Sequence, residues 1–77
     1  MRYTGNKSAE TAKQVLTLLE QGQLSQRWLA KQTGINLATL NRRIQGKSDF
    51  TLIELEHVAN AFDISLSDLI FSKEAVS

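Results

Sequence analysis

Residues 25–46 read SQRWLAKQTGINLATLNRRIQG, and this segment predicts two short helices that meet at a glycine. The first helix opens after Ser25, whose hydroxyl can accept a hydrogen bond from an unpaired amide in the first turn. Gly34 ends it, because glycine tolerates left-handed backbone, and Ile35 can then pack back onto the helix. Asn36 is a good cap for a second helix over residues 37–45, which stops at Gly46.

The second of these helices has two different faces when its residues are placed about 100° apart. The apolar face, which needs a protein core, holds Leu37, Leu40 and Ile44. The opposite face holds Ala38, Asn41, Arg42 and Gln45, and no acidic residue lies between positions 36 and 45. Arginine can fork onto guanine, and asparagine or glutamine onto adenine, in a major groove wide enough for a helix. The polar face therefore indicates contact with base edges, with an ordinary solvated helix face as the alternative.

Further helices are predicted on both sides of this segment. A helix over residues 8–21, ending at Gly22, places four apolar residues at core spacing: Ala12, Val15, Leu16 and Leu19. Leu24 anchors the connection that follows, and Phe50 plugs the core after the loop at residues 47–49. Residues 1–7 are expected to form a flexible arm and residues 72–77 a frayed tail.

Two capping patterns predict the last two helices. Thr51 and Glu54 form a capping box, in which each side chain bonds the other's backbone amide. The apolar positions that follow are Leu52, Leu55, Val58, Ala59 and Phe62. Ser65 and Asp68 repeat the pattern weakly before a short fifth helix that holds Leu66, Leu69 and Ile70.

Residues 26–45 resemble the helix-turn-helix of the phage Cro and repressor family, the XRE-like group of transcription regulators. Gln26 falls where that family often has glutamine, and Ala30 falls where a small residue lets the helices cross closely. Gly34 lies in the turn between the helices, while Ile35 and Leu40 fall at buried positions.

The resemblance continues beyond the helix-turn-helix and covers residues 15–70. Gly46 and Lys47 resemble the glycine and basic residue that commonly follow the recognition helix, and residues 52–69 resemble the closing pair of helices. The resemblance implies an all-α fold, a compact five-helix repressor-like DNA-binding domain with a helix-turn-helix. We expect residues 1–77 to form this single domain.

Two positions depart from the family pattern. Arg43 lies where the family usually has an aliphatic residue, and Ile44 lies where a polar or acidic residue is common. Since Ile44 is one turn from Leu40, a slight rotation of the helix end would let Ile44 fill the core site and turn Arg43 outward, near the DNA backbone. The contact register of the last helical turn, including Gln45, is open at this point.

The resemblance implies binding of duplex DNA with residues 36–45 in the major groove. The residues expected to contact bases are Leu37, Ala38, Thr39, Asn41 and Arg42. Those expected to contact phosphates are Gln26, Arg27, Arg43, Gln45, Lys47 and Ser48. A lone module of this size buries limited DNA surface, so we expect a homodimer that reads a palindromic operator. Repression by promoter occlusion, and a phage or mobile-element setting such as phage immunity, follow from the same resemblance.

The charges are divided unevenly along the chain, although the net charge is only +1. Residues 1–50 carry eight Lys and Arg against three Asp and Glu, so 8 − 3 = +5, and residues 51–77 carry one against five, so 1 − 5 = −4. This polarity favours one face toward a polyanion, because phosphate contacts dominate affinity for nucleic acids. Ordinary charge scatter in a short chain is the alternative.

Composition argues against several other classes of function. The chain has no cysteine and one histidine, His57. It can therefore form neither a disulfide nor a cysteine zinc site, and we expect no cofactor. An enzyme is not expected, since no phosphate-cradling glycine loop or catalytic arrangement of acids is evident. With no apolar run of about 20 residues and no secretory signal, we expect a cytoplasmic protein that contacts no membrane. No small-molecule effector is evident.

Two rival functions use the same predicted fold. The chain could be an antitoxin-like or accessory module that binds a protein, in which case binding would be insensitive to salt. It could instead bind nucleic acid without sequence preference, which predicts steep salt dependence with little discrimination.

Overall fold

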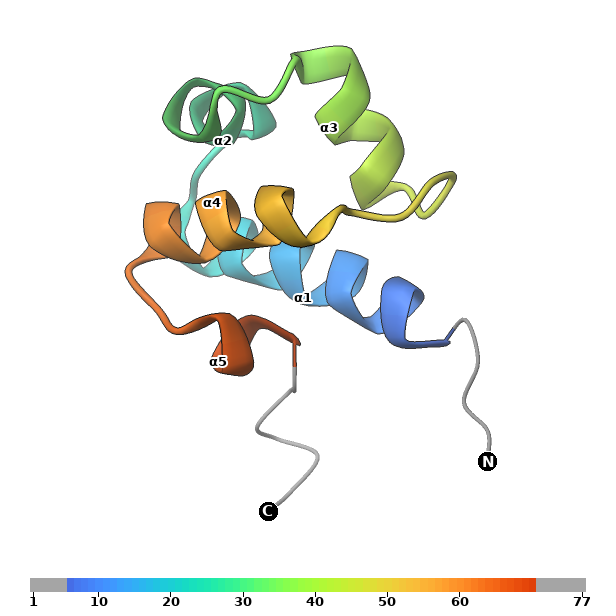
Figure 1. Ribbon diagram of the computed structural model, residues 1–77. Coiled ribbons are helices and arrows are strands. Elements are labelled where there is room, and N and C mark those ends of the chain that lie inside the picture. The colour runs from blue at the N-terminus through green and yellow to red at the C-terminus, as the bar shows by residue number, and fades with distance from the viewer. Residues whose placement is uncertain (1–5, 71–77) are drawn as a thin grey trace.

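The computed structural model describes residues 6–70, which form five helices and no strand (Figure 1). The helices are α1 (Asn6–Gly22), α2 (Gln26–Thr33), α3 (Leu37–Ile44), α4 (Leu52–Phe62) and α5 (Leu66–Ile70). The predicted all-α fold with a helix-turn-helix is confirmed.

Helices α2 and α3 lie together on the side of the molecule opposite α5 (Figure 1). Helix α2 packs against α3 and α4, while α1 packs against α3 and α5. Helices α4 and α5 are also in contact. Helix α3 is therefore held from one side, which leaves its opposite face outward.

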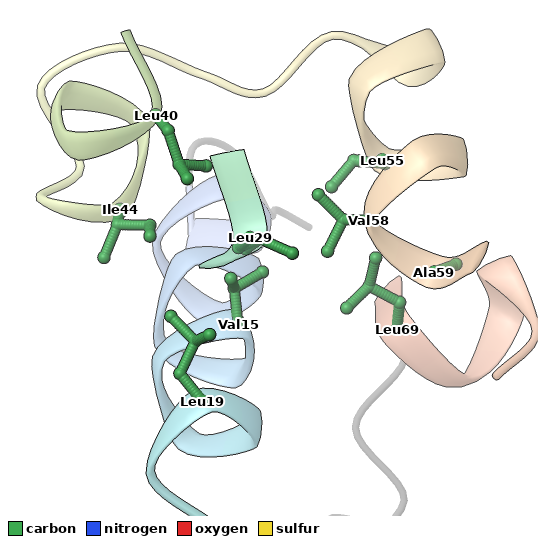
Figure 2. Close-up of a cluster of buried hydrophobic side chains, with 9 residues drawn as sticks. All are labelled: Val15, Leu19, Leu29, Leu40, Ile44, Leu55, Val58, Ala59 and Leu69. Carbon is green, nitrogen blue, oxygen red and sulfur yellow. The ribbon is translucent and has the colours of Figure 1, made fainter. Parts of the chain in front are cut away.

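All five helices contribute to one cluster of buried apolar side chains (Figure 2). The cluster consists of Val15, Leu19, Leu29, Leu40, Ile44, Leu55, Val58, Ala59 and Leu69. Leu24, Trp28 and Phe50 pack around it as partly buried residues, which confirms the anchoring roles predicted for Leu24 and Phe50. The ring of Trp28 lies 5.7 Å from that of Phe62. Because helices of eight residues are not stable alone in water, α2 and α3 depend on this cluster.

The predicted caps form. The Ser25 hydroxyl accepts from the backbone amide of Trp28 at 2.9 Å. Asn36 Oδ1 accepts from the two amides that open α3, at 2.9 and 3.3 Å. Thr51 and Glu54 make the reciprocal bonds of a capping box, at 3.1 and 2.9 Å. Each of these helices therefore begins where its polar side chain predicts.

Three of the connections between helices share one design. Gln23, Gly34 and Asp63 have left-handed backbone, with φ of 56°, 77° and 59°. An apolar residue follows each of them and packs against the core; these residues are Leu24, Ile35 and Ile64. The residue after that caps the next helix with its side chain; these are Ser25, Asn36 and Ser65. Each connection is thus three residues long and leaves little freedom in the angle between its helices.

The first of these connections differs from the prediction. Helix α1 was expected to end at Gly22, yet Gly22 remains helical and Gln23 takes the left-handed position. A Cβ at Gly22 would lie only 3.0 Å from Leu24 Cδ1. The glycine therefore makes room for the Leu24 anchor, and the reversal of the chain falls on the next residue.

Several predicted boundaries and core positions also need correction. Helix α1 begins at Asn6 rather than at residue 8, so positions 6 and 7 of the expected arm are helical, whereas positions 1–5 and the tail 72–77 lie outside the described residues. Helix α3 ends at Ile44, and Gln45 is its cap. Leu16, predicted at core spacing, is 38% exposed, and Leu52, the first of the apolar positions predicted for the fourth helix, is 59% exposed. Leu16 lies at the edge of the stripe through Val15, and Leu52 lies in the first turn of α4, ahead of its buried residues.

The left-handed Gln23 generates a stability prediction. A side chain with a Cβ costs about 1 kcal/mol in this backbone region relative to glycine. Gln23→Gly should therefore raise the free energy of unfolding by about 0.5–1 kcal/mol in urea titration. Gln21→Gly, the same substitution inside α1, should lower it by about 1 kcal/mol. A loss of stability in both variants would contradict the assigned backbone geometry.

Candidate nucleic-acid interface

The buried face of α3 fixes which of its residues point outward. Leu40 is fully buried and Ile44 is 9% exposed, so Ile44 fills the core position as the departure from the family pattern predicted. Arg42 lies about 180° around the helix from the midpoint of these two residues. The core thus sets the rotation of α3 about its own axis.

The outward side of α3 combines small, polar and cationic groups. Ala38 and Arg42 are exposed, while Leu37, Thr39 and Asn41 are half-buried along its margins. The Arg42 side chain makes no ion pair or hydrogen bond with the rest of residues 6–70. Its guanidinium is therefore available to an external acceptor. The structure places the five predicted base-contacting residues on α3, and their contact with bases stays a prediction.

Three amide side chains connect the start of α2 to the end of α3. Asn41 Nδ2 donates to Gln26 Oε1 at 3.0 Å, and Gln45 Nε2 donates to Asn41 Oδ1 at 2.5 Å. Sequence reasoning treated the three residues as separate contacts and did not find these bonds. The spacing of Asn41 and Gln45 by four residues is compatible with one of the bonds, whereas the bond to Gln26 depends on how the two helices cross.

Arg43 joins α3 to the loop and to α4. Its Nε and Nη2 donate to the two carboxylate oxygens of Glu54 at 2.9 and 3.2 Å, and its Nη1 donates to Ser48 Oγ at 2.7 Å. Glu54 Oε1 also accepts the capping bond from the Thr51 amide. We call these four residues the Arg43 brace. A phosphate contact by Arg43 stays a prediction, but the structure already gives its guanidinium partners within the chain.

The electrostatics of this brace follow from its geometry. The bonds from Arg43 lower the pKa of the Glu54 carboxyl below its ordinary value, and the Thr51 amide acts in the same direction. The Glu54 carboxylate in turn raises the pKa of Arg43. The two side chains are only 18% and 19% exposed, so the pair is better shielded from water than a typical surface ion pair.

The remaining predicted phosphate contacts surround α3. Arg27, Gln45 and Lys47 are exposed, and Gln26 and Ser48 are half-buried. Gly46 has a φ of 81°, and the Lys47 amide donates to the Arg42 carbonyl at 3.0 Å. This closure of the helix end turns the chain sharply and places Lys47 three residues after the last residue of α3.

The family of the chain follows from this arrangement together with a sequence comparison. The family model described as Cro/C1-type HTH DNA-binding domain matches residues 15–71. The chain belongs to this family. As a Cro/C1-type protein it is a DNA-binding transcription regulator, and α2 and α3 are its helix-turn-helix. Comparison with curated proteins and with solved structures found no match.

Within residues 6–70, no helix has the length and apolar character needed to cross a membrane. The same residues contain no group of three or more His, Cys, Asp or Glu side chains that could hold a metal ion.

The Arg43 brace predicts a pH-dependent contribution to stability. Because the pKa of Glu54 is lower in the folded than in the unfolded chain, the contribution is present above its ordinary value of 4.5 and is lost as the pH falls through the folded pKa. Glu54→Gln should lower the free energy of unfolding by about 1 kcal/mol near pH 7, and this difference should shrink as the pH falls below 4.5 and through the folded pKa of Glu54. Glu56→Gln, an exposed neighbour on α4, is the matched control. Equal effects of the two substitutions at both pH values would refute this role of Glu54.

Proposed function

We propose that this protein is a transcriptional repressor that binds duplex DNA sequence-specifically, with α3 in the major groove. The observation that carries the proposal is the exposed Arg42, which lies opposite the buried Leu40 and Ile44 and has no partner among residues 6–70. A guanidinium on the outward side of a helix suits the two acceptors of guanine. The core then supplies the rotational register that base reading requires.

The proposed contacts divide into base and phosphate contacts. Ala38 and Arg42 face base edges from the centre of the outward side, with Leu37, Thr39 and Asn41 at its margins. The phosphates on either side are contacted from α2, from the end of α3 and from the loop after it; the residues are Gln26, Arg27, Arg43, Gln45, Lys47 and Ser48. The uneven charge supports this orientation, because the helix-turn-helix lies in the cationic part of the chain.

The proposed operator is palindromic and is bound by two copies of the chain. One helix reads only a few base pairs, so discrimination against the rest of a genome needs a second half-site, about one helical turn away. A dimer on such a site would repress by covering a promoter. A phage or mobile-element setting is part of the same proposal.

Selection from random duplex DNA tests the proposal directly. The expected result is an enriched site with two-fold symmetry. Enrichment of an asymmetric site would contradict the palindromic operator bound by two copies, but it would still support sequence-specific binding. If the protein retains all sequences equally and its affinity depends steeply on salt, the result would favour a non-specific binder. No retention even at low salt would overturn DNA binding and favour the antitoxin-like protein-binding module.

Two substitutions separate base reading from phosphate binding. Arg42→Ala should lower affinity for the selected site by about 1–3 kcal/mol and relax preference at one base pair, while Lys47→Ala should weaken all sequences similarly and reduce the salt dependence. Lys13→Ala on α1 removes one exposed cation outside the helix-turn-helix. This control should change neither the affinity nor its salt dependence strongly. If Arg42→Ala leaves affinity and sequence preference unchanged, the outward side of α3 is not the reading face.

A further inference from the structure

The connection between α3 and α4 differs from the other connections in its length. It spans residues 45–51, whereas each of the others is three residues long. Gly46 reverses the chain near its start, and Phe50 packs against the core near its end. Figure 1 shows this loop projecting from the body of the molecule beside the end of α3. Lys47 and Ser48, two of the proposed phosphate contacts, lie between these two fixed points.

The Arg43 brace holds the middle of this loop. Arg43 Nη1 donates to Ser48 Oγ at 2.7 Å, while Nε and Nη2 donate to Glu54, in the first turn of α4, at 2.9 and 3.2 Å. One guanidinium thus bonds both the loop and the helix that follows it. Ser48 accepts the bond from Arg43 with its oxygen, so its hydroxyl hydrogen is left to donate to another group. A phosphate oxygen is a suitable acceptor.

The charges around Arg43 argue against its use as a phosphate-binding cation. Glu54, and to a smaller extent Asp49, raise the pKa of Arg43. One cation and two carboxylates give the three side chains a net charge of 1 − 2 = −1. To meet a phosphate as a free cation, Arg43 would have to leave the Glu54 carboxylate, which is only 19% exposed and would then lose its partner.

We propose that the Arg43 brace orders the loop after α3 for phosphate binding by Lys47 and Ser48, and that Arg43 is a positioning residue and not a phosphate ligand. This inference rests on the proposed function, and it removes Arg43 from the proposed phosphate contacts. A loop that is already ordered loses less conformational freedom when it binds. The brace therefore raises the affinity for DNA without adding a positive charge to the interface.

Arg43→Lys separates the two roles, because it keeps the charge but removes the forked donor. Lysine binds phosphate as a point charge, yet it cannot bond both carboxylate oxygens of Glu54 and the Ser48 hydroxyl in the geometry of a guanidinium. We expect the affinity for the selected site to fall about 3- to 10-fold, with the base preference at each position unchanged. A phosphate ligand at position 43 predicts an affinity close to that of the wild type.

Glu54→Gln gives effects of opposite sign for the two roles. If Glu54 only competes with DNA for Arg43, its neutralisation frees the cation and tightens binding. If Glu54 completes the brace, the substitution weakens binding, and we expect a loss of about 3-fold or more. Glu56→Gln is the matched control, because it removes an acidic charge from an exposed position of the same helix and leaves the brace intact. The affinity of Glu54→Gln is therefore compared with that of Glu56→Gln.

A mutant cycle between Arg43 and Lys47 tests whether the brace acts through the loop. Lys47→Ala should cost less affinity in the Arg43→Lys background than in the wild type, by about 3-fold or more, because the loop that presents Lys47 is no longer ordered. A role of Arg43 in stability alone predicts no such coupling. Each affinity is measured at a temperature at which thermal unfolding shows the variant to be fully folded, so that an unfolded fraction cannot account for a loss.

The possible results separate this inference from the proposed function. Three results would each overturn the positioning role while leaving specific DNA binding intact. These are an unchanged affinity of Arg43→Lys, binding by Glu54→Gln that is as tight as or tighter than that of Glu56→Gln, and additive effects of the substitutions at positions 43 and 47. If the wild-type protein binds no DNA, the proposed function itself fails.

Discussion

The helix-turn-helix of this protein depends on burial of side chains that its own two helices cannot bury together. Helices α2 and α3 have eight residues each, a length at which an isolated helix in water is mostly unfolded. Leu29 and Leu40 have no exposed surface, and they reach it only within a cluster shared with α1, α4 and α5. The outward side of α3 therefore depends on the whole fold. The angle of α3 to the other helices is set by residues that are buried in the core.

The short connections convert this shared core into a fixed geometry. A left-handed residue, an apolar anchor and a capping side chain follow one another at three of them. The anchor fixes the connection to the core while the cap starts the next helix, so neither helix can pivot without exposing apolar surface. This is why a connection between α2 and α3 of only a few residues can hold two helices at an angle.

Much of this fold was predictable because helix ends carry local chemical signals. Ser25, Asn36 and Thr51 predicted where helices begin, and Gly34 and Gly46 predicted where the chain reverses. The reversals at Gln23 and Asp63 carried no glycine signal, since both residues have a Cβ and take left-handed backbone at a cost, where the surrounding packing holds them there. Exposure of Leu16 and Leu52 was equally hidden, because the helical period identifies the apolar stripe but not how far the core extends along it.

The candidate site was predictable in its position but not in its internal bonds. Spacing on α3 was enough to place Ala38 and Arg42 opposite the buried residues. The departure of positions 43 and 44 from the family pattern, with an apolar residue at 44 in place of a polar one, predicted that Ile44 turns inward. Whether Arg43 and Asn41 face a ligand or a neighbouring side chain is decided by residues 11 and 15 positions away in the sequence. Such pairs depend on how helices cross, and that angle is a property of the assembled core.

The Arg43 brace explains why an acidic side chain is tolerated beside the proposed DNA-facing helix. Glu54 bonds the amide at the start of α4 and at the same time neutralises a cation at the end of α3. Because Arg43 is paired, the cations of residues 37–47 that have no partner within the described part of the chain are Arg42, on the outward side of α3, and Lys47, beyond the end of α3. A backbone contact at Lys47 and a base contact at Arg42 would then be held in register by the Lys47 amide, which bonds the Arg42 carbonyl directly. The core, the Arg43 brace and the hydrogen bond at the end of α3 thus all contribute to how Arg42 and Lys47 are presented.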